Sequence, residues 1–91
     1  MNNKVLIKLI VPEINLSFDV FLPVNEVIWK IKKMLIKCVC DLSNASMDMN
    51  TEYVLINKDG SRIYKNNEIL IETDIRNASE ILLITKNKKE Q

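Results

Sequence analysis

The 91-residue sequence contains no histidine, a single glycine, two prolines and two cysteines. Because histidine is the commonest general base and metal ligand, its absence disfavours acid–base catalysis and a histidine-bound metal site. One glycine is too few for a glycine-rich phosphate-binding loop. Cys38 and Cys40 would point about 200° apart on a helix, so they cannot together hold a metal ion or form a disulfide. We therefore expect a protein that is not an enzyme and that uses no cofactor and no metal.

The charge and the apolar runs narrow the class of partner. A net charge of +1 gives the chain no overall attraction to nucleic acid or to an anionic membrane. Four lysines, Lys30, Lys32, Lys33 and Lys37, make one flank basic, and a solvated flank is favoured there over a nucleic-acid site. No apolar run approaches the about 20 residues of a transmembrane helix, and no signal-peptide pattern is present. We expect a cytoplasmic protein that does not insert into a membrane.

One stretch of the chain has a clear helical period. The pattern predicts an amphipathic helix over about residues 25–41, with Asn25 capping its N-terminus and Pro23 keeping the preceding chain extended. The expected buried stripe consists of Val24, Val27, Ile28, Ile31, Met34, Leu35, Cys38 and Leu42. This arrangement assigns Cys38 to the core and Cys40 to the surface.

The remaining chain alternates between strands and turns. Apolar alternation predicts strands over residues 4–11, 16–22, 53–57, 62–64 and 81–85. Between the last two, an irregular or 3₁₀ segment should bring Leu70 and Ile75 into the core. The order strand, strand, helix and three strands predicts an α+β fold with one mixed four- to five-stranded sheet on a single helix. We expect one domain over residues 1–86 and a flexible polar tail over residues 87–91.

Three segments carry a resemblance to the β-grasp fold of ubiquitin. Residues 68–75, EILIETDI, resemble the segment that precedes the last strand of ubiquitin-like proteins, and residues 76–84, RNASEILLI, resemble the turn and strand that follow. Residues 18–23, FDVFLP, lead into the helix as in the small bacterial ubiquitin-like proteins of the YukD/EsaB type, which are encoded with type VII secretion systems. The resemblance covers about residues 4–85.

This resemblance implies a non-conjugating protein-interaction module that acts as an accessory or regulatory component of a type VII secretion system. Such a protein could be recruited peripherally to a membrane complex. The final residues, KNKKEQ, lack the Gly-Gly ending of ubiquitin-like modifiers and sulfur carriers, so the resemblance does not extend to conjugation. Two alternatives stay open: a small carrier or modifier with an atypical C-terminus, and a homo-oligomeric structural protein.

Two apolar surfaces are expected to contact a partner protein or a second copy. The outward face of the sheet should carry Leu6, Ile10, Phe21, Leu82 and Ile84, joined by one of the pairs Tyr53/Leu55 and Val54/Ile56. On the helix, Trp29, Ile36 and Cys40 fall within about 40° of one another outside the predicted stripe. Trp29 and Ile36 are the expected contacts there. The competing interpretations are that another segment covers the helix strip and that a strand is assigned to the wrong face.

Overall fold

The computed structural model describes residues 3–44 and 51–86. The strands are β1 (Lys4–Val11), β2 (Leu16–Pro23), β3 (Tyr53–Asn57), β4 (Ile63–Tyr64) and β5 (Glu80–Thr85). One α-helix, α1 (Ile28–Ser43), follows β2, and two 3₁₀ helices, η1 (Pro12–Ile14) and η2 (Leu70–Glu72), lie in the connections. The tail expected over residues 87–91 and part of the loop after the helix, residues 45–50, lie outside the described residues.

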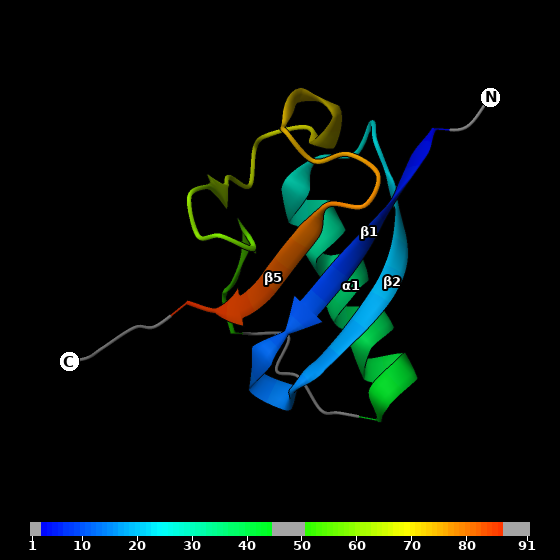
Figure 1. Cartoon of the computed structure of the whole chain (residues 1–91), viewed down its shortest axis with the longest axis vertical. Helices are drawn as coiled ribbons and strands as arrows, with labels where there is room; N and C mark the ends of the chain where they lie inside the picture. Colours follow the sequence, from blue (N-terminus) through cyan, green and yellow to red (C-terminus); the bar gives the residue numbers. More distant parts are fainter. Residues whose placement is uncertain (1–2, 45–50, 87–91) are drawn as a thin grey trace.

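The five strands form one mixed sheet in the order β2-β1-β5-β3-β4, and α1 crosses one face of it (Figure 1). The pairing of β1 with β5 at the centre is parallel, and the other three pairings are antiparallel. The apolar strand β5 is therefore paired on both sides. One mixed sheet packed on a single helix is the ubiquitin-like β-grasp arrangement, which confirms the fold predicted from the sequence.

Alternate side chains of the strands build the core against α1. The buried strand residues include Ile7, Leu9, Val11, Leu22, Leu55, Ile81 and Leu83. The helix contributes Ile28, Ile31, Leu35, Ile36 and Val39. Leu70 and Ile75 are also fully buried, and Leu70 begins η2, so the prediction of a short 3₁₀ segment that lowers both residues into the core is confirmed. Every second residue of these strands faces the opposite side of the sheet.

The N-terminus of α1 differs from the prediction. The helix begins at Ile28, its N-cap is Val27, and no side chain caps it, so the expected Asn25 cap was wrong. The first N–H groups donate instead to backbone carbonyls of a distant segment: Ile28 to Glu68 at 2.8 Å and Trp29 to Asn66 at 3.2 Å. Because tertiary contacts satisfy these donors, the helix needs no side-chain cap.

The buried face of α1 is also rotated relative to the prediction. Met34 and Leu42 are 45% and 63% exposed, whereas Ile36 is only 6% exposed. The segment ending at Tyr53 runs beside the Ile36 flank, where Lys32 Nζ donates to the Tyr53 carbonyl oxygen at 2.8 Å. Met34 lies on the opposite flank, toward the edge strand β2, where the described residues leave nearly half of it exposed.

The same rotation corrects the assignment of the cysteines. Cys40 packs against the hydrophobic core, so its expected place on the surface was wrong. Cys38 is half-buried, and both cysteines are free thiols. Their side chains lie on different flanks of α1, as their spacing of two residues requires.

Candidate protein-interaction surfaces

The outer face of the sheet, opposite α1, is apolar over four of its strands. Leu6 lies opposite Phe21, Ile10 lies opposite Leu82, and Val54 lies opposite Ile84. Of the two pairs that the sequence left open, Val54/Ile56 therefore faces outward, because Tyr53 and Leu55 are buried against α1. The outward orientation predicted for Leu6, Ile10, Phe21, Leu82 and Ile84 agrees with the strand register. Their role in binding a partner stays a prediction.

A row of charged residues divides this outer face into two apolar areas. Lys8 in β1 lies opposite both Asp19 in β2 and Glu80 in β5. The row continues to Lys58, whose Nζ forms an ion pair with Glu80 Oε1 at 2.8 Å. The single apolar surface expected from the sequence is therefore two patches separated by charges of alternating sign. Such a row disfavours wrong partners more than it adds affinity.

The smaller area, which we name the Leu6–Phe21 patch, lies at the start of β1. The Phe21 side chain is 59% exposed, and it borders a hollow of about 570 Å³ with Leu6, Lys8 and Asp19 on its walls. The loop that carries Asn77 also lines the hollow, and it is held to β1 because the Leu6 N–H donates to Asn77 Oδ1 at 2.8 Å. An apolar floor with a charged rim is the usual composition of a protein contact.

The larger area, which we name the Ile84 patch, spans β1, β5, β3 and β4. Its members are Ile10, Val54, Ile56, Ile63, Leu82 and Ile84. Five of these side chains shield one another and are half-buried, and Ile63 at the edge is exposed. A contiguous apolar area of this kind on an open sheet face marks an interaction site more often than scattered surface residues do.

The helix strip is only partly exposed. Trp29 is 43% exposed, and the ammonium groups of Lys30 and Lys33 lie 5.5 and 5.3 Å from the centre of its ring. Ile36 is buried, so its expected place on an exposed strip was wrong, because the chain leading to Tyr53 covers that flank. Trp29 and Ile36 still line one hollow of about 160 Å³, too small for a typical ligand.

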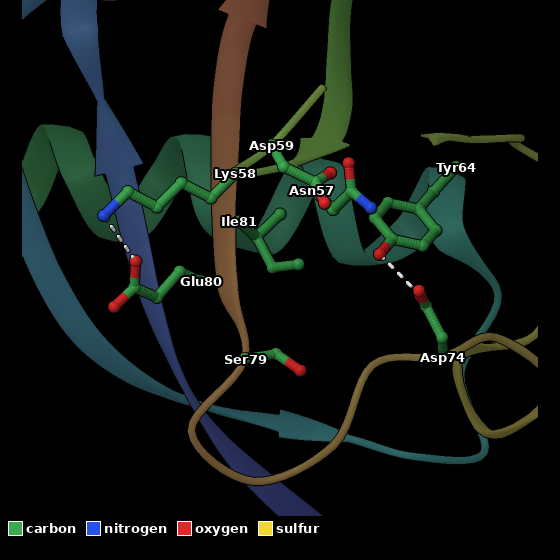
Figure 2. A pocket seen from close by; sticks show the side chains of 8 residues that line it. All are labelled: Asn57, Lys58, Asp59, Tyr64, Asp74, Ser79, Glu80 and Ile81. Atoms are coloured by element: carbon green, nitrogen blue, oxygen red, sulfur yellow. Dashed lines mark hydrogen bonds and ion pairs between the residues drawn. The ribbon is translucent and has the colours of Figure 1, made fainter. Parts of the chain in front are cut away.

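A polar pocket of about 440 Å³, which the sequence did not reveal, lies where β3, β4 and the start of β5 meet (Figure 2). Tyr64 Oη donates to Asp74 Oδ1 at 2.6 Å on one side, and Lys58 pairs with Glu80 on the other. The hydrogen bond with Glu80 raises the pKa of Lys58, and the same contact lowers the pKa of Glu80. The pocket's charged groups therefore hold loops together.

Neither a metal centre nor a membrane span is found within residues 3–44 and 51–86. No three histidine, cysteine, aspartate or glutamate side chains in those segments lie close enough to hold an ion. No helix in the same segments has the length and apolar character needed to cross a bilayer.

The sequence matches no family profile and no curated protein. The EccD5 ubiquitin-like domain from Mycobacterium xenopi aligns with a TM-score of 0.69 and 14% identity over 97% of this chain and 100% of that domain. The protein has the ubiquitin-like β-grasp fold. A chain of the MycP5-free ESX-5 inner membrane complex aligns with a TM-score of 0.72 and 14% identity over 99% of this chain, which spans 23% of that longer chain.

The fold also occurs outside secretion complexes. A chain of the toluene 4-monooxygenase HD complex with the inhibitor 4-bromobenzoate aligns with a TM-score of 0.75 and 7% identity over 91% of this chain and 99% of that one. All three identities are too low to transfer a function. What these likenesses establish is the arrangement of strands and helix, and the function has to be argued from the surfaces.

Proposed function

We propose that the protein is a non-conjugating ubiquitin-like interaction module that binds another protein through the outer face of its sheet. The observation that carries this proposal is the Ile84 patch, which is apolar across four strands although an open sheet face is normally polar. Burial of such a patch favours association, because removal of apolar surface from water is the main non-directional driving force for contact between proteins. The function is binding, with no chemical step.

The charged row beside the patch supplies orientation. Lys8 and Lys58 alternate with Asp19 and Glu80 across the sheet, so a partner must place complementary charges in matching order. Apolar contact alone is non-directional, whereas a like charge opposite any member of the row costs free energy. The Ile84 patch therefore gives affinity, and the row fixes how the partner lies on the sheet.

We further propose that the partner belongs to a type VII secretion system, in which the protein serves as an accessory or regulatory component. The sequence supports this through the resemblance of residues 18–23 to YukD/EsaB proteins, within the wider ubiquitin-like resemblance of residues 68–84. The likeness to the EccD5 domain and to a chain of the ESX-5 inner membrane complex, which is a type VII secretion complex, is consistent with it. Binding to such a complex would recruit the protein peripherally to a membrane.

The test is affinity co-purification of the tagged protein from its native cells, followed by mass spectrometry. The wild-type protein should recover components of the secretion machinery, and Leu82→Lys or Ile84→Lys should lose them while keeping the circular dichroism of a folded domain. Ile71→Lys is the matched control, because Ile71 is an exposed isoleucine in η2 outside both patches. Equal recovery by Ile84→Lys would exclude the patch, and recovery of the protein alone would exclude the secretion role.

A further inference from the structure

The two edges of the sheet are protected to very different degrees. The β4 edge is two residues long and lies between Arg62 and Lys65. The β2 edge is eight residues long, with Asp19 as its only charged residue and Pro23 at its very end. Natural sheets shield their edges with short strands, lysines, prolines or bulges, because a long apolar edge pairs with other chains. Only β4 has this protection, so β2 is the edge that is open to a partner.

The bonding of β1 shows which backbone groups of β1 face β2. Lys8 N–H donates to the Ser79 carbonyl at 2.9 Å, and the Leu6 carbonyl accepts from Ala78 N–H at 2.8 Å, so the even residues of β1 direct their backbone groups toward β5. Because this direction alternates along a strand, the odd residues of β1 form the hydrogen-bonded pairs with β2.

It follows that the even residues of β2, such as Val20, which lies opposite Ile7, use their N–H and C=O groups within the sheet. The odd residues Ser17, Asp19 and Phe21 direct theirs away from it. Within residues 3–44 and 51–86, no hydrogen bond to these outward groups is found. These three residues, at alternate positions along the edge strand, therefore present the backbone N–H and C=O groups that an added antiparallel strand would bond.

The surface beside this edge is apolar. The flank of α1 that carries Met34 lies away from β3 and so toward the β2 side of the sheet, because the opposite flank is held to β3 by the bond from Lys32. Met34 and Leu42 are exposed, and Phe18 and Val20 in β2 are only partly buried. An added strand would cover apolar side chains on the helix side while its backbone paired with β2.

We propose that two copies of the chain pair through their β2 strands, antiparallel and about a twofold axis, so that the two sheets become one. A strand that adds to β2 needs an unpaired edge of its own, apolar residues on the α1 side and no lysine. The β2 strand of a second copy has all three properties. A register with Val20 on the axis places Asp19 opposite the partner's Phe21 and avoids two facing carboxylates. This pairing uses the edge of the sheet, so it does not depend on the outer-face proposal.

The test is sedimentation equilibrium of the untagged protein over a series of concentrations. The wild-type chain should dimerise, and Asp19→Pro should weaken the association by about tenfold or more, because proline removes an outward N–H but no bond between β1 and β2. Asp19→Ala is the matched control, since it keeps the N–H and should still dimerise. Circular dichroism should show the same folded spectrum for both variants.

Hydrogen exchange of the wild-type chain, followed by NMR, supplies a second measurement that needs no variant. The amide protons of Ser17, Asp19 and Phe21 should exchange more slowly as concentration rises, whereas those of Phe18 and Val20, already bonded to β1, should not change. A wild-type monomer at every concentration, or exchange at these three amides independent of concentration, would overturn the proposal. A dimer that survives Asp19→Pro but not Ile84→Lys would place the contact on the outer face instead.

Discussion

The Tyr64 hydroxyl donates a 2.6 Å hydrogen bond to Asp74 Oδ1 and so joins the short strand β4 to the connection that leads into β5. The Tyr64 ring is buried, and the Arg62 guanidinium lies 5.2 Å from its centre. Arg62 also bonds Glu68 Oε2 at 2.7 Å. A two-residue strand has little backbone pairing of its own, so these side-chain contacts hold the end of the sheet together.

We expect Tyr64→Phe to lower the free energy of unfolding at neutral pH by about 1–2 kcal/mol, because the Asp74 carboxylate loses its donor. Burial, followed by the bond to Asp74, raises the pKa of Tyr64 above its usual value. A group whose pKa is raised by folding stabilises the protein below its unfolded pKa, about 10, and this contribution is lost as pH rises further. The wild-type advantage over Tyr64→Phe in urea unfolding should therefore shrink above about pH 10. A constant advantage would contradict this assignment.

Glu68 provides the corresponding test in acid. Its carboxylate accepts from the Lys65 N–H and from Arg62, both at 2.7 Å, and the Lys65 bond is the main reason that its pKa is lowered. The side chain is 26% exposed, so we expect Glu68→Gln to cost only about 1 kcal/mol at pH 7.

The pH dependence of that loss follows from the direction of the pKa shift. A carboxyl whose pKa is lowered by folding stabilises the protein above its unfolded pKa, about 4.3, and the contribution disappears as pH falls through the folded value. Unfolding curves of wild type and Glu68→Gln should therefore converge below about pH 4. Glu72→Gln, a change in a neighbouring exposed glutamate, is the control and should leave stability unchanged at pH 7.

Ala78 has a φ of 73°, a left-handed conformation that is unfavourable for a residue with a β-carbon. Its N–H donates to the Leu6 carbonyl, so the loop is held in this shape beside the Leu6–Phe21 patch. We expect Ala78→Gly to raise the free energy of unfolding by about 0.5–1 kcal/mol, since relief of strain exceeds the added entropy of the unfolded chain. Ala78→Val should lower it. Thermal unfolding of the three proteins decides, and a less stable glycine variant would contradict the backbone assignment.

Trp29 is the single tryptophan, so its fluorescence reports on the basic flank of α1. With Lys30 and Lys33 close to the ring, the ratio of iodide to caesium quenching of Trp29 at low ionic strength should be about twofold higher than the ratio for free tryptophan. Lys33→Glu should reduce or reverse this preference. Lys37→Glu makes the same charge change about two helical turns from Trp29 and should have a smaller effect. A wild-type ratio equal to that of free tryptophan would show that the lysines do not lie over the ring.

The sequence predicts the strands well because their signal is local. Alternation along β1 and β5 correctly predicts that Leu6 and Leu82 lie on the outer face, and Leu9 and Leu83, at positions of the other parity, are buried. Whichever strands become neighbours, a period of two separates the faces of a sheet. The fold class follows from the same information, together with the one helical segment.

The helix shows where local information ends. Its apolar stripe is broad, and which flank becomes buried depends on the segment ending at Tyr53, which is distant in sequence. That contact buried Ile36 and left Met34 exposed. The expected Asn25 cap failed for the same reason, since carbonyls near Glu68 took the role of a capping side chain.

The layout of the candidate sites depends on which residues lie opposite each other on neighbouring strands, and the sequence does not give this strand pairing. The outward residues could be named strand by strand, but the row of Lys8, Asp19 and Glu80 exists only in the observed register. The same register determines that the outward backbone groups of β2 belong to Asp19 and its odd-numbered neighbours. The pattern of apolar residues in each strand predicts an apolar outer face, and the strand register determines how charged residues divide that face.

The central pairing of β1 with β5 also governs how the chain can fold while it is being made. A ribosome delivers β1 first and β5 last among the five strands, yet these two lie side by side in the middle of the sheet (Figure 1). Until residues 80–85 have emerged, β1–β2 and β3–β4 remain two separate hairpins with no strand between them. Completion of the domain during synthesis is therefore one late event that waits for the final strand, not a gradual growth from the N-terminus.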